Sequence, residues 1–210
     1  MIKIGKLVTL SGIDGSGKST CAKIIKDYFM QKGEKAIVID AMKNGVFTVG
    51  LKQYSKNNGK SYRECFSPDL VNLAWTADLI HNYETKVKNL LSEGYNVILH
   101  RSELCCKVYS HVFSLQNEFI DIILDSYDFE YDINIFLDID PLRAYERIIK
   151  RTESADITEK ETLEKLYVAD RLYREILKDR KYEKICFINS YMPEENLVQE
   201  LQELLKNKGV

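Results

Sequence analysis

Hydrophobic and polar positions follow two alternating patterns along the chain. Short runs rich in apolar residues predict strands, and longer stretches with an apolar residue every three or four positions predict helices. The run at residues 35–40 is apolar enough to predict a strand buried on both faces of a sheet. The predicted strands are residues 6–11, 35–40, 95–100, 131–138 and 184–189. The predicted helices are residues 21–29, 67–94, about 104–127, 141–151, about 159–179 and 193–206. This alternation predicts one α/β domain over residues 1–210, with a five-stranded parallel sheet flanked by helices on both faces.

The longest predicted helix opens with Ser67 and Pro68, which favour a first helical turn, and Gly94 ends it. Its predicted apolar face consists of Leu70, Leu73, Ala74, Ala77, Ile80, Val87, Leu90 and Leu91. Two polar segments interrupt the regular pattern. Residues 41–67 predict a mobile loop or a short helix on the substrate side, and the polar gap after residue 151 predicts a short lid near residues 151–159.

Between the first strand and the first helix, residues 12–20 read GIDGSGKST and fit the phosphate-loop pattern G-x-x-x-x-G-K-[ST]. The pattern requires a strand before it and a helix after it, and this chain predicts both, which disfavours a chance match. Gly12, Gly15 and Gly17 let successive backbone N–H groups converge on phosphate oxygens, and the helix N-terminus adds further donors. The predicted ligand is therefore a nucleoside triphosphate.

The side chains of this loop add a cation, a metal ligand and one acid. We expect Lys18 to bind the β- and γ-phosphates of ATP and the Ser19 hydroxyl to bind Mg²⁺. Ser16 and Thr20 complete the ATP-binding loop. The triphosphate would repel the carboxylate of Asp14, so we expect Asp14 to face a hydroxyl group of the phosphate acceptor.

The predicted third strand ends in His100 and Arg101, at the edge of a parallel sheet where ligands bind. Arg101 can clamp a phosphate or a developing negative charge with paired donors, and the alternative is a surface ion pair. His100 can be a base, a partner of a water on Mg²⁺, or a histidine packed at the strand end. The sequence leaves these three roles open.

Two arginines, Arg147 and Arg151, lie four residues apart and therefore share one helix face. Phosphoryl transfer needs cations around the equatorial oxygens of the transferred group, and two arginines beside a lid can meet that need. The alternative is a solvated basic face. On the acceptor side, Asp40 ends the second strand and is a candidate general base. Aromatic side chains that can form a wall for a ring, or else pack in the core, are Tyr62, Phe66, Trp75 and Tyr109.

Composition narrows the choice of partners. Lys and Arg number 30 and Asp and Glu number 32, so the net charge is −2 and no nucleic-acid partner is indicated. No apolar run approaches the roughly 20 residues that cross a bilayer, so no membrane partner is expected. A strand close to the N-terminus argues against a signal peptide. The 5 cysteines lack metal-ligand spacing, so we expect reduced thiols in a cytoplasmic protein.

With these residues in place, the chain resembles the thymidylate kinase family of P-loop nucleotide kinases over essentially all 210 residues. The phosphate loop with its internal Asp14 carries the resemblance most specifically. Other similar segments are residues 73–78, residues 135–141 with Arg147 and Arg151 after them, and residues 188–190. The resemblance implies a P-loop kinase fold with a five-stranded core, Mg-ATP as donor, Asn189 beside the adenine of ATP, and a homodimer packed through helices.

The chain departs from the family pattern at four places, all expected to face the acceptor or the transferred phosphate. Leu79 stands where the family usually has an Arg that contacts thymine, and His100 where it usually has an Asp that supports Mg²⁺. Asp40 and the two residues after it, with Lys43 nearby, stand where an Arg for the acceptor phosphate is usual. Residues 156–159 lack the usual lid Arg.

These observations favour an ATP-dependent phosphotransferase that moves the γ-phosphate of Mg-ATP to a nucleoside monophosphate similar to dTMP. Its catalytic candidates are Lys18, Asp40, Arg101, Arg147 and Arg151, and its acceptor-binding candidates are Asp14, Asp40, Trp75 and Arg101. A deoxynucleoside or another hydroxyl compound is the alternative acceptor, because few cations remain for an acceptor phosphate and Arg101-Ser102 also resembles the Arg-Ser of deoxynucleoside kinases. A nucleotide-binding module with weak catalysis is a third possibility. A GTPase or motor is disfavoured, because no Asp-x-x-Gly follows the third strand.

Overall fold

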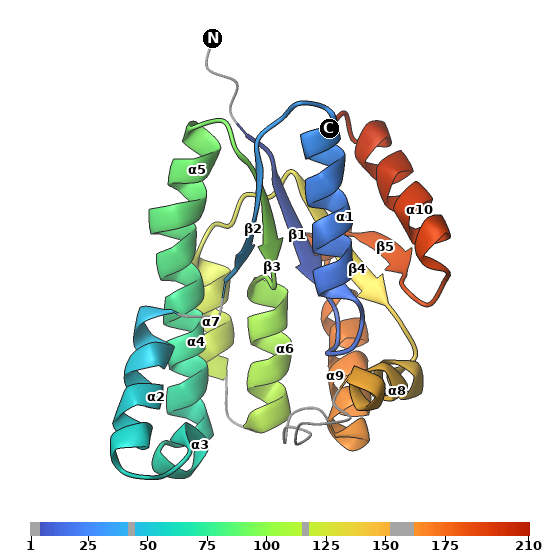
Figure 1. Cartoon of the computed structure of the whole chain (residues 1–210). Coiled ribbons are helices and arrows are strands. Elements are labelled where there is room, and N and C mark those ends of the chain that lie inside the picture. Colours follow the sequence, from blue (N-terminus) through green and yellow to red (C-terminus); the bar gives the residue numbers. More distant parts are fainter. Residues whose placement is uncertain (1–4, 42–44, 115–117, 152–161) are drawn as a thin grey trace.

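A five-stranded parallel sheet forms the centre of the chain (Figure 1). The computed structural model describes residues 5–41, 45–114, 118–151 and 162–210. The strands are β1 (Leu7–Ser11), β2 (Ala36–Asp40), β3 (Asn96–His100), β4 (Ile133–Asp138) and β5 (Cys186–Asn189). Their order is β2-β3-β1-β4-β5, and every pairing is parallel. The predicted fold class is confirmed, and each strand ends where the sequence pattern indicated. The prediction that residues 35–40 are buried on both faces is wrong, because β2 lies at the edge of the sheet and Val38 is 37% exposed.

The helices of the described residues follow the predicted order, except that two helices lie within residues 46–65, where the sequence predicted a mobile loop or a short helix. They are α1 (Lys18–Gln31), α2 (Val46–Asn57), α3 (Tyr62–Cys65), α4 (Pro68–Asn82), α5 (Lys88–Ser92), α6 (Glu103–Phe113), α7 (Glu118–Ser126), α8 (Pro141–Arg151), α9 (Leu163–Ile176) and α10 (Glu194–Asn207). A π-helical turn, η1 (Tyr83–Val87), joins α4 to α5, and a 3₁₀ turn, η3 (Arg180–Tyr182), precedes β5. The helical region predicted over residues 104–127 is two helices, α6 and α7. The predicted lid, apart from Arg151, and the start of the predicted helix at residue 159 lie outside the described residues.

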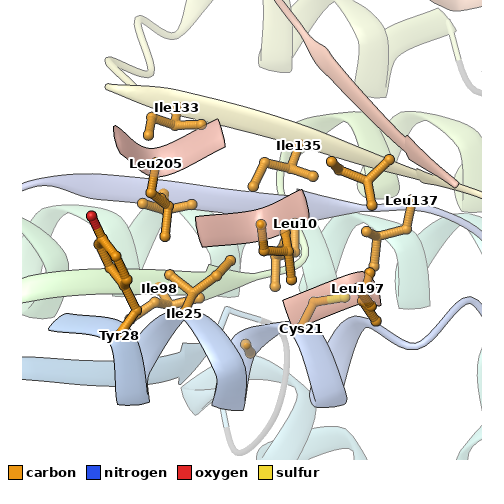
Figure 2. Close-up of a cluster of buried hydrophobic side chains, with 14 of the residues drawn as sticks. Leu10, Cys21, Ile25, Tyr28, Ile98, Ile133, Ile135, Leu137, Leu197 and Leu205 are labelled. Atoms are coloured by element: carbon orange, nitrogen blue, oxygen red, sulfur yellow. The ribbon is translucent and has the colours of Figure 1, made fainter. Parts of the chain in front are cut away.

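Helices cover both faces of the sheet. On one face, α1 and α10 pack against strand residues such as Leu10 and Ile135, with Ile25 and Leu205 among the helix residues (Figure 2). On the other face, one apolar cluster joins β4 to α6, α8 and α9, and a second joins β1 and β3 to α4 and α7. Since β1 lies between β3 and β4, the loop that follows β1 leaves the middle of the sheet at the edge where parallel strands end.

The cysteines agree with the expectation of reduced thiols. All of them are free, and Cys105 and Cys106 are buried in α6. Burial raises the pKa of the Cys106 thiol, so this side chain stays protonated and unreactive. Within the described ranges, no helix combines the length and the apolar composition that a membrane crossing requires. The homodimer stays a prediction.

The buried face of α4 differs from the predicted one. Leu70 and Leu73 are 44% and 39% exposed, so the prediction that they face the core is wrong. The buried residues of α4 are Val71, Ala74 and Leu79, of which Ala74 was predicted, together with four polar ones, namely Asn72, Thr76, Asp78 and Asn82. The polar side chains can be buried because each forms a hydrogen bond, for example from Asn82 Nδ2 to the Ala41 carbonyl at 2.8 Å. Polarity along α4 therefore marks contacts with neighbouring segments and does not mark exposure to solvent.

Asp78 holds the N-terminus of α2. Its Oδ1 accepts a hydrogen bond from the Phe47 amide at 2.9 Å, and its Oδ2 accepts from the amide and hydroxyl of Thr48 at 2.9 and 2.7 Å. The N-cap residue of α2 itself is Gly45, which has no side chain to do this. A Cβ on Gly45 would lie 2.0 Å from Asp78 Cγ, so the close contact requires glycine. A carboxylate from α4 thus caps a helix that is distant in sequence.

We predict that Asp78→Ala lowers the free energy of unfolding by about 3 kcal/mol, because two helix amides and a buried hydroxyl lose a charged acceptor. Urea denaturation followed by circular dichroism measures the change. Asp27→Ala, on the exposed side of α1, is the matched control and should stay within about 0.5 kcal/mol of the parent. An equal effect of the two substitutions would show that Asp78 does not hold α2.

Candidate active site

The loop between β1 and α1 packs closely against other backbone segments. Gly15 has a φ of 83°, which favours glycine, and a Cβ at this position would lie 2.4 Å from the Ala144 carbonyl oxygen of α8. The Tyr109 hydroxyl of α6 accepts a hydrogen bond from the Asp14 amide at 2.9 Å, and the Tyr173 hydroxyl of α9 donates to the Gly12 carbonyl at 3.2 Å. Three helices therefore fix the shape of this loop from outside its own segment.

Lys18 lies over the loop with its side chain almost fully buried. Its ammonium donates to the carbonyl oxygens of Gly12 at 2.8 Å and of Ile13 at 2.7 Å. Asp14 Oδ1 lies 3.9 Å away. The cation is thus held at the start of α1, where backbone N–H groups and the helix dipole also favour an anion.

Arg101 and Asp14 form a largely buried ion pair between two segments. Arg101 Nη2 lies 2.8 Å from Asp14 Oδ1, and the two side chains are 17% and 9% exposed. Burial alone would lower the pKa of the Arg101 guanidinium, but the Asp14 carboxylate outweighs it and raises this pKa above the usual range. Among the described residues, Arg101 is the one non-glycine residue with a positive φ, 81°. Such a backbone conformation costs roughly 1 kcal/mol or more and is typical of functional positions.

These side chains line a cavity of about 410 Å³. The lining residues are Asp14, Gly15, Gly17, Lys18, Ser19, Thr20, His100, Arg101, Arg147, Ile148 and Arg151. Four cationic side chains face one carboxylate, a balance that suits a polyphosphate. Most of the loop, His100 and the three predicted arginines therefore come together as the sequence predicts. Their functional roles stay predictions.

Arg147 is fixed beside the loop by its neighbours. Its Nη2 donates to the Ser190 carbonyl at 2.7 Å, and its guanidinium lies 5.6 Å from the centre of the Tyr191 ring. A Cβ on Gly17 would lie 3.6 Å from Arg147 Nη1, so a side chain there would fill the space between loop and guanidinium. Gly17 therefore keeps a space open between the loop and the guanidinium of Arg147.

Asn189 and Asp40 do not line this cavity. Asn189 is exposed at the end of β5, and its Oδ1 accepts the Tyr191 amide at 2.9 Å, so it stabilises a turn. Asp40 lies beside His100, with its Oδ2 3.6 Å from His100 Nδ1. The other ring nitrogen, Nε2, lies 3.3 Å from Ser19 Oγ. The ends of β2 and β3 thus place the carboxylate of Asp40 next to the imidazole of His100, whose other nitrogen faces the predicted metal ligand Ser19 of α1.

The described residues contain no group of three or more His, Cys, Asp or Glu side chains that could hold a metal ion by themselves. A divalent cation here would therefore take most of its ligands from phosphate oxygens. The Ser19 hydroxyl, at the first turn of α1 and on the cavity wall, fits this role.

A second cavity of about 180 Å³ lies between α4, α6 and α9. Its lining residues are Phe66, Pro68, Val71, Asn72, Trp75, Val112, Phe113 and Lys165. Trp75 and Phe66 are there as predicted, whereas the sequence gave no reason to select Asn72, Phe113 or Lys165. The pattern of Asn72 on the same helix face as Thr76 was the one available signal. Nothing is described for the Tyr62 side chain.

Aromatic rings connect the second cavity to the first. The Trp75 and Phe113 rings lie edge to face at 6.4 Å, and the Phe113 and Tyr109 rings stack at 6.4 Å. The Arg101 guanidinium lies 5.9 Å from the centre of the Tyr109 ring. We call the second cavity the aromatic cavity, because Phe66, Trp75 and Phe113 line it. The rings of Phe113 and Tyr109 on α6 link it to Arg101 of the cationic cavity.

Leu79 is placed differently from the expectation that it faces the acceptor. It is fully buried in the cluster that joins α4 to β1 and β3, and it lines neither of the two cavities. An apolar side chain at this position gains more from the core than from a polar site.

Comparison with known proteins decides the family. The family model described as "Thymidylate kinase" matches residues 10–201. The chain belongs to the thymidylate kinase family. It is 27% identical over 207 residues to "Thymidylate kinase" of Haemophilus ducreyi, an alignment that covers 96% of this chain and 94% of the relative. It is 30% identical over 158 residues to "Probable thymidylate kinase" of Methanococcoides burtonii, with 71% and 72% covered.

A further relative, "Probable thymidylate kinase" of Staphylothermus marinus, is 28% identical over 137 residues, and the alignment spans 65% of either chain. Family membership makes this chain a kinase, a phosphotransferase of the thymidylate kinase type. Identities of 25% to 30% do not transfer the acceptor from these relatives to this chain.

We predict that the Asp14–Arg101 pair couples the two segments energetically. Either Asp14→Ala or Arg101→Ala should cost about 3 kcal/mol of unfolding free energy, because each leaves a buried charge without its partner. The double variant should cost about 1–3 kcal/mol less than the sum of the single variants. Denaturant unfolding of all four proteins measures this coupling.

The exposed pair of Arg143 and Glu146, 3.1 Å apart and 48% and 43% exposed, is the matched control. Its coupling should be below about 1 kcal/mol. Additive effects of the Asp14 and Arg101 substitutions would show that the buried pair does not join the loop to β3.

Proposed function

We propose that this kinase transfers the γ-phosphate of Mg-ATP to a nucleoside monophosphate similar to dTMP. The observation that carries the proposal is that the stacked rings of Tyr109 and Phe113 on α6 link the two cavities, since Arg101 of the cationic cavity lies beside Tyr109 and Phe113 lines the second cavity. Phosphoryl transfer needs neighbouring sites for donor and acceptor, because the two must be held in line and close together.

The donor would lie in the cationic cavity. Lys18 and the loop amides bind the β- and γ-phosphates, and Arg147 and Arg151 lie where negative charge spreads during transfer. The Ser19 hydroxyl would hold Mg²⁺, which would supply positive charge to the phosphate oxygens when bound. Catalysis then rests on positioning and electrostatics, with no covalent step on the protein.

The acceptor base would lie in the aromatic cavity. Its volume of about 180 Å³ is below the usual 300–1,000 Å³ of whole ligand sites, so it suits one ring rather than a complete nucleotide. Trp75 and Phe113 offer ring faces and edges, and the Asn72 amide offers polar contacts. Lys165 is the one charged residue on this wall, with its ammonium 4.8 Å from the Phe113 ring centre. An ammonium here favours an acceptor that carries negative charge.

One observation favours the alternative of a deoxynucleoside or another hydroxyl acceptor. Arg101 already pairs with Asp14 at 2.8 Å, so much of its charge is neutralised before any acceptor binds. Less positive charge then remains for an acceptor phosphate. An acceptor that presents only a neutral hydroxyl needs less positive charge in its site.

We predict that Lys18→Ala lowers phosphoryl transfer about a hundredfold or more, because the loop loses its buried cation. The measurement is ADP release with ATP, Mg²⁺ and a panel of deoxynucleoside monophosphates and deoxynucleosides. Lys23→Ala, on the exposed side of α1, should leave turnover unchanged. Transfer to thymidine but not to dTMP would replace the proposal by its alternative. Tight Mg-ATP binding without transfer to any acceptor would instead favour a nucleotide-binding module.

We predict that Trp75→Ala raises the KM for the acceptor about tenfold and leaves the KM for ATP unchanged, because one stacking surface for a ring is lost. Steady-state kinetics with each substrate varied in turn separates the two constants. Tyr167→Ala removes a 49% exposed ring from α9 and serves as the control. A change in the KM for ATP of the same size would contradict the assignment of this cavity to the acceptor.

A further inference from the structure

His100 is, apart from the apolar Ile148, the one residue on the wall of the cationic cavity that is neither an arginine nor part of the phosphate loop. Its side chain is 12% exposed, and its Nδ1 atom is fully buried and has no hydrogen-bond partner among the described residues. A buried imidazole nitrogen without a hydrogen bond costs free energy, so its position needs a reason.

The spacing of two atoms gives one. His100 Nε2 lies 3.3 Å from Ser19 Oγ. In an octahedral metal site with bonds of about 2.1 Å, neighbouring ligand atoms lie roughly 3.0 Å apart. The nitrogen and the hydroxyl oxygen are therefore spaced much as two neighbouring ligands of one cation would be.

The carboxylate of Asp40 supports the same role. Its Oδ2 lies 3.6 Å from His100 Nδ1, on the opposite side of the ring from Ser19. A histidine that binds a metal through one nitrogen commonly directs its other N–H toward a carboxylate, which fixes the ring and strengthens the ligand. The register of the sheet sets this arrangement, because Asp40 and His100 are paired positions of β2 and β3.

We propose that His100 Nε2 is a direct ligand of the divalent cation that binds with the nucleotide, and that Asp40 is the positioning residue for its ring. The proposal rests on the proposed function, since the cation is the one bound with ATP. An imidazole nitrogen suits later first-row metals better than Mg²⁺, which prefers oxygen ligands. The chain therefore accepts Co²⁺ relative to Mg²⁺ more readily than a site with an Asp at this position.

Pulsed electron paramagnetic resonance of bound Mn²⁺ tests the ligand directly. The sample is the whole chain with Mn²⁺ and the β,γ-methylene analogue of ATP, prepared with unlabelled and with ¹⁵N-labelled histidine. We expect a directly bonded nitrogen whose signal changes with the label and disappears in His100→Asn and His100→Asp. His81→Asn, on α4, is the matched control and should keep the signal.

Metal affinities provide a second readout. Titration with the same nucleotide analogue should show a Co²⁺-to-Mg²⁺ affinity ratio about tenfold lower in His100→Asp than in the parent. Asp40→Asn should weaken Co²⁺ binding about tenfold and keep the nitrogen signal, as expected for a positioning residue. Thermal unfolding of each variant checks that it is folded.

The outcomes separate this inference from the proposed function. If Mn²⁺ and the nucleotide analogue bind together but no histidine nitrogen is detected, the inference is wrong and the kinase proposal stands. If the analogue does not bind with Mn²⁺, Co²⁺ or Mg²⁺, both the kinase proposal and the assignment of His100 as a ligand are wrong. An unchanged Co²⁺-to-Mg²⁺ ratio in His100→Asp would also overturn the assignment of His100 as a ligand.

Discussion

The ion pair between Asp14 and Arg101 is the contact on which the site depends. It joins the loop after β1 to the turn after β3, and both segments lie at the same edge of the sheet. In this pair Arg101 has a φ of 81°, a conformation that an arginine rarely takes. The Arg101 amide donates to the Leu10 carbonyl at 3.1 Å, which holds this turn against β1. The pair thus holds the loop from the cavity side, while Tyr109 and Tyr173 hold its backbone with hydrogen bonds from α6 and α9.

Tyr109 of α6 also links the two cavities, which differ in chemistry and share no lining residue. Tyr109 accepts the Asp14 amide with its hydroxyl, lies near Arg101 with one part of its ring and stacks on Phe113. Burial and then the Asp14 charge raise the pKa of the Tyr109 hydroxyl well above its usual value, so it stays neutral between the charged and the apolar side. Tyr109 thus lies between the Asp14–Arg101 ion pair and the rings that line the aromatic cavity.

The sequence was sufficient for the fold and for the phosphate loop because both depend on local patterns. The ends of the five strands follow from apolar runs, and the loop follows from residues 12–20. Contacts between distant segments were not predictable. Asp78 caps α2 from a separate helix, and Lys165 reaches the aromatic cavity from α9, although both look like exposed charges in the sequence. Leu70 and Leu73 show the opposite error, because they look like core residues in the sequence but are exposed in the structure. An apolar period alone does not say which helix face is buried.

Two of the departures from the family pattern are close together in space. Asp40 stands where an arginine is usual and His100 where an aspartate is usual, and their side chains lie 3.6 Å apart. An arginine beside a histidine would repel a cation shared with Ser19, whereas a carboxylate beside the histidine favours one. Asp40 therefore suits His100 better than the usual arginine would, and His100 suits Asp40 better than the usual aspartate would. Asp40 and His100 therefore form one changed pair at the ends of β2 and β3, beside the proposed metal ligand Ser19.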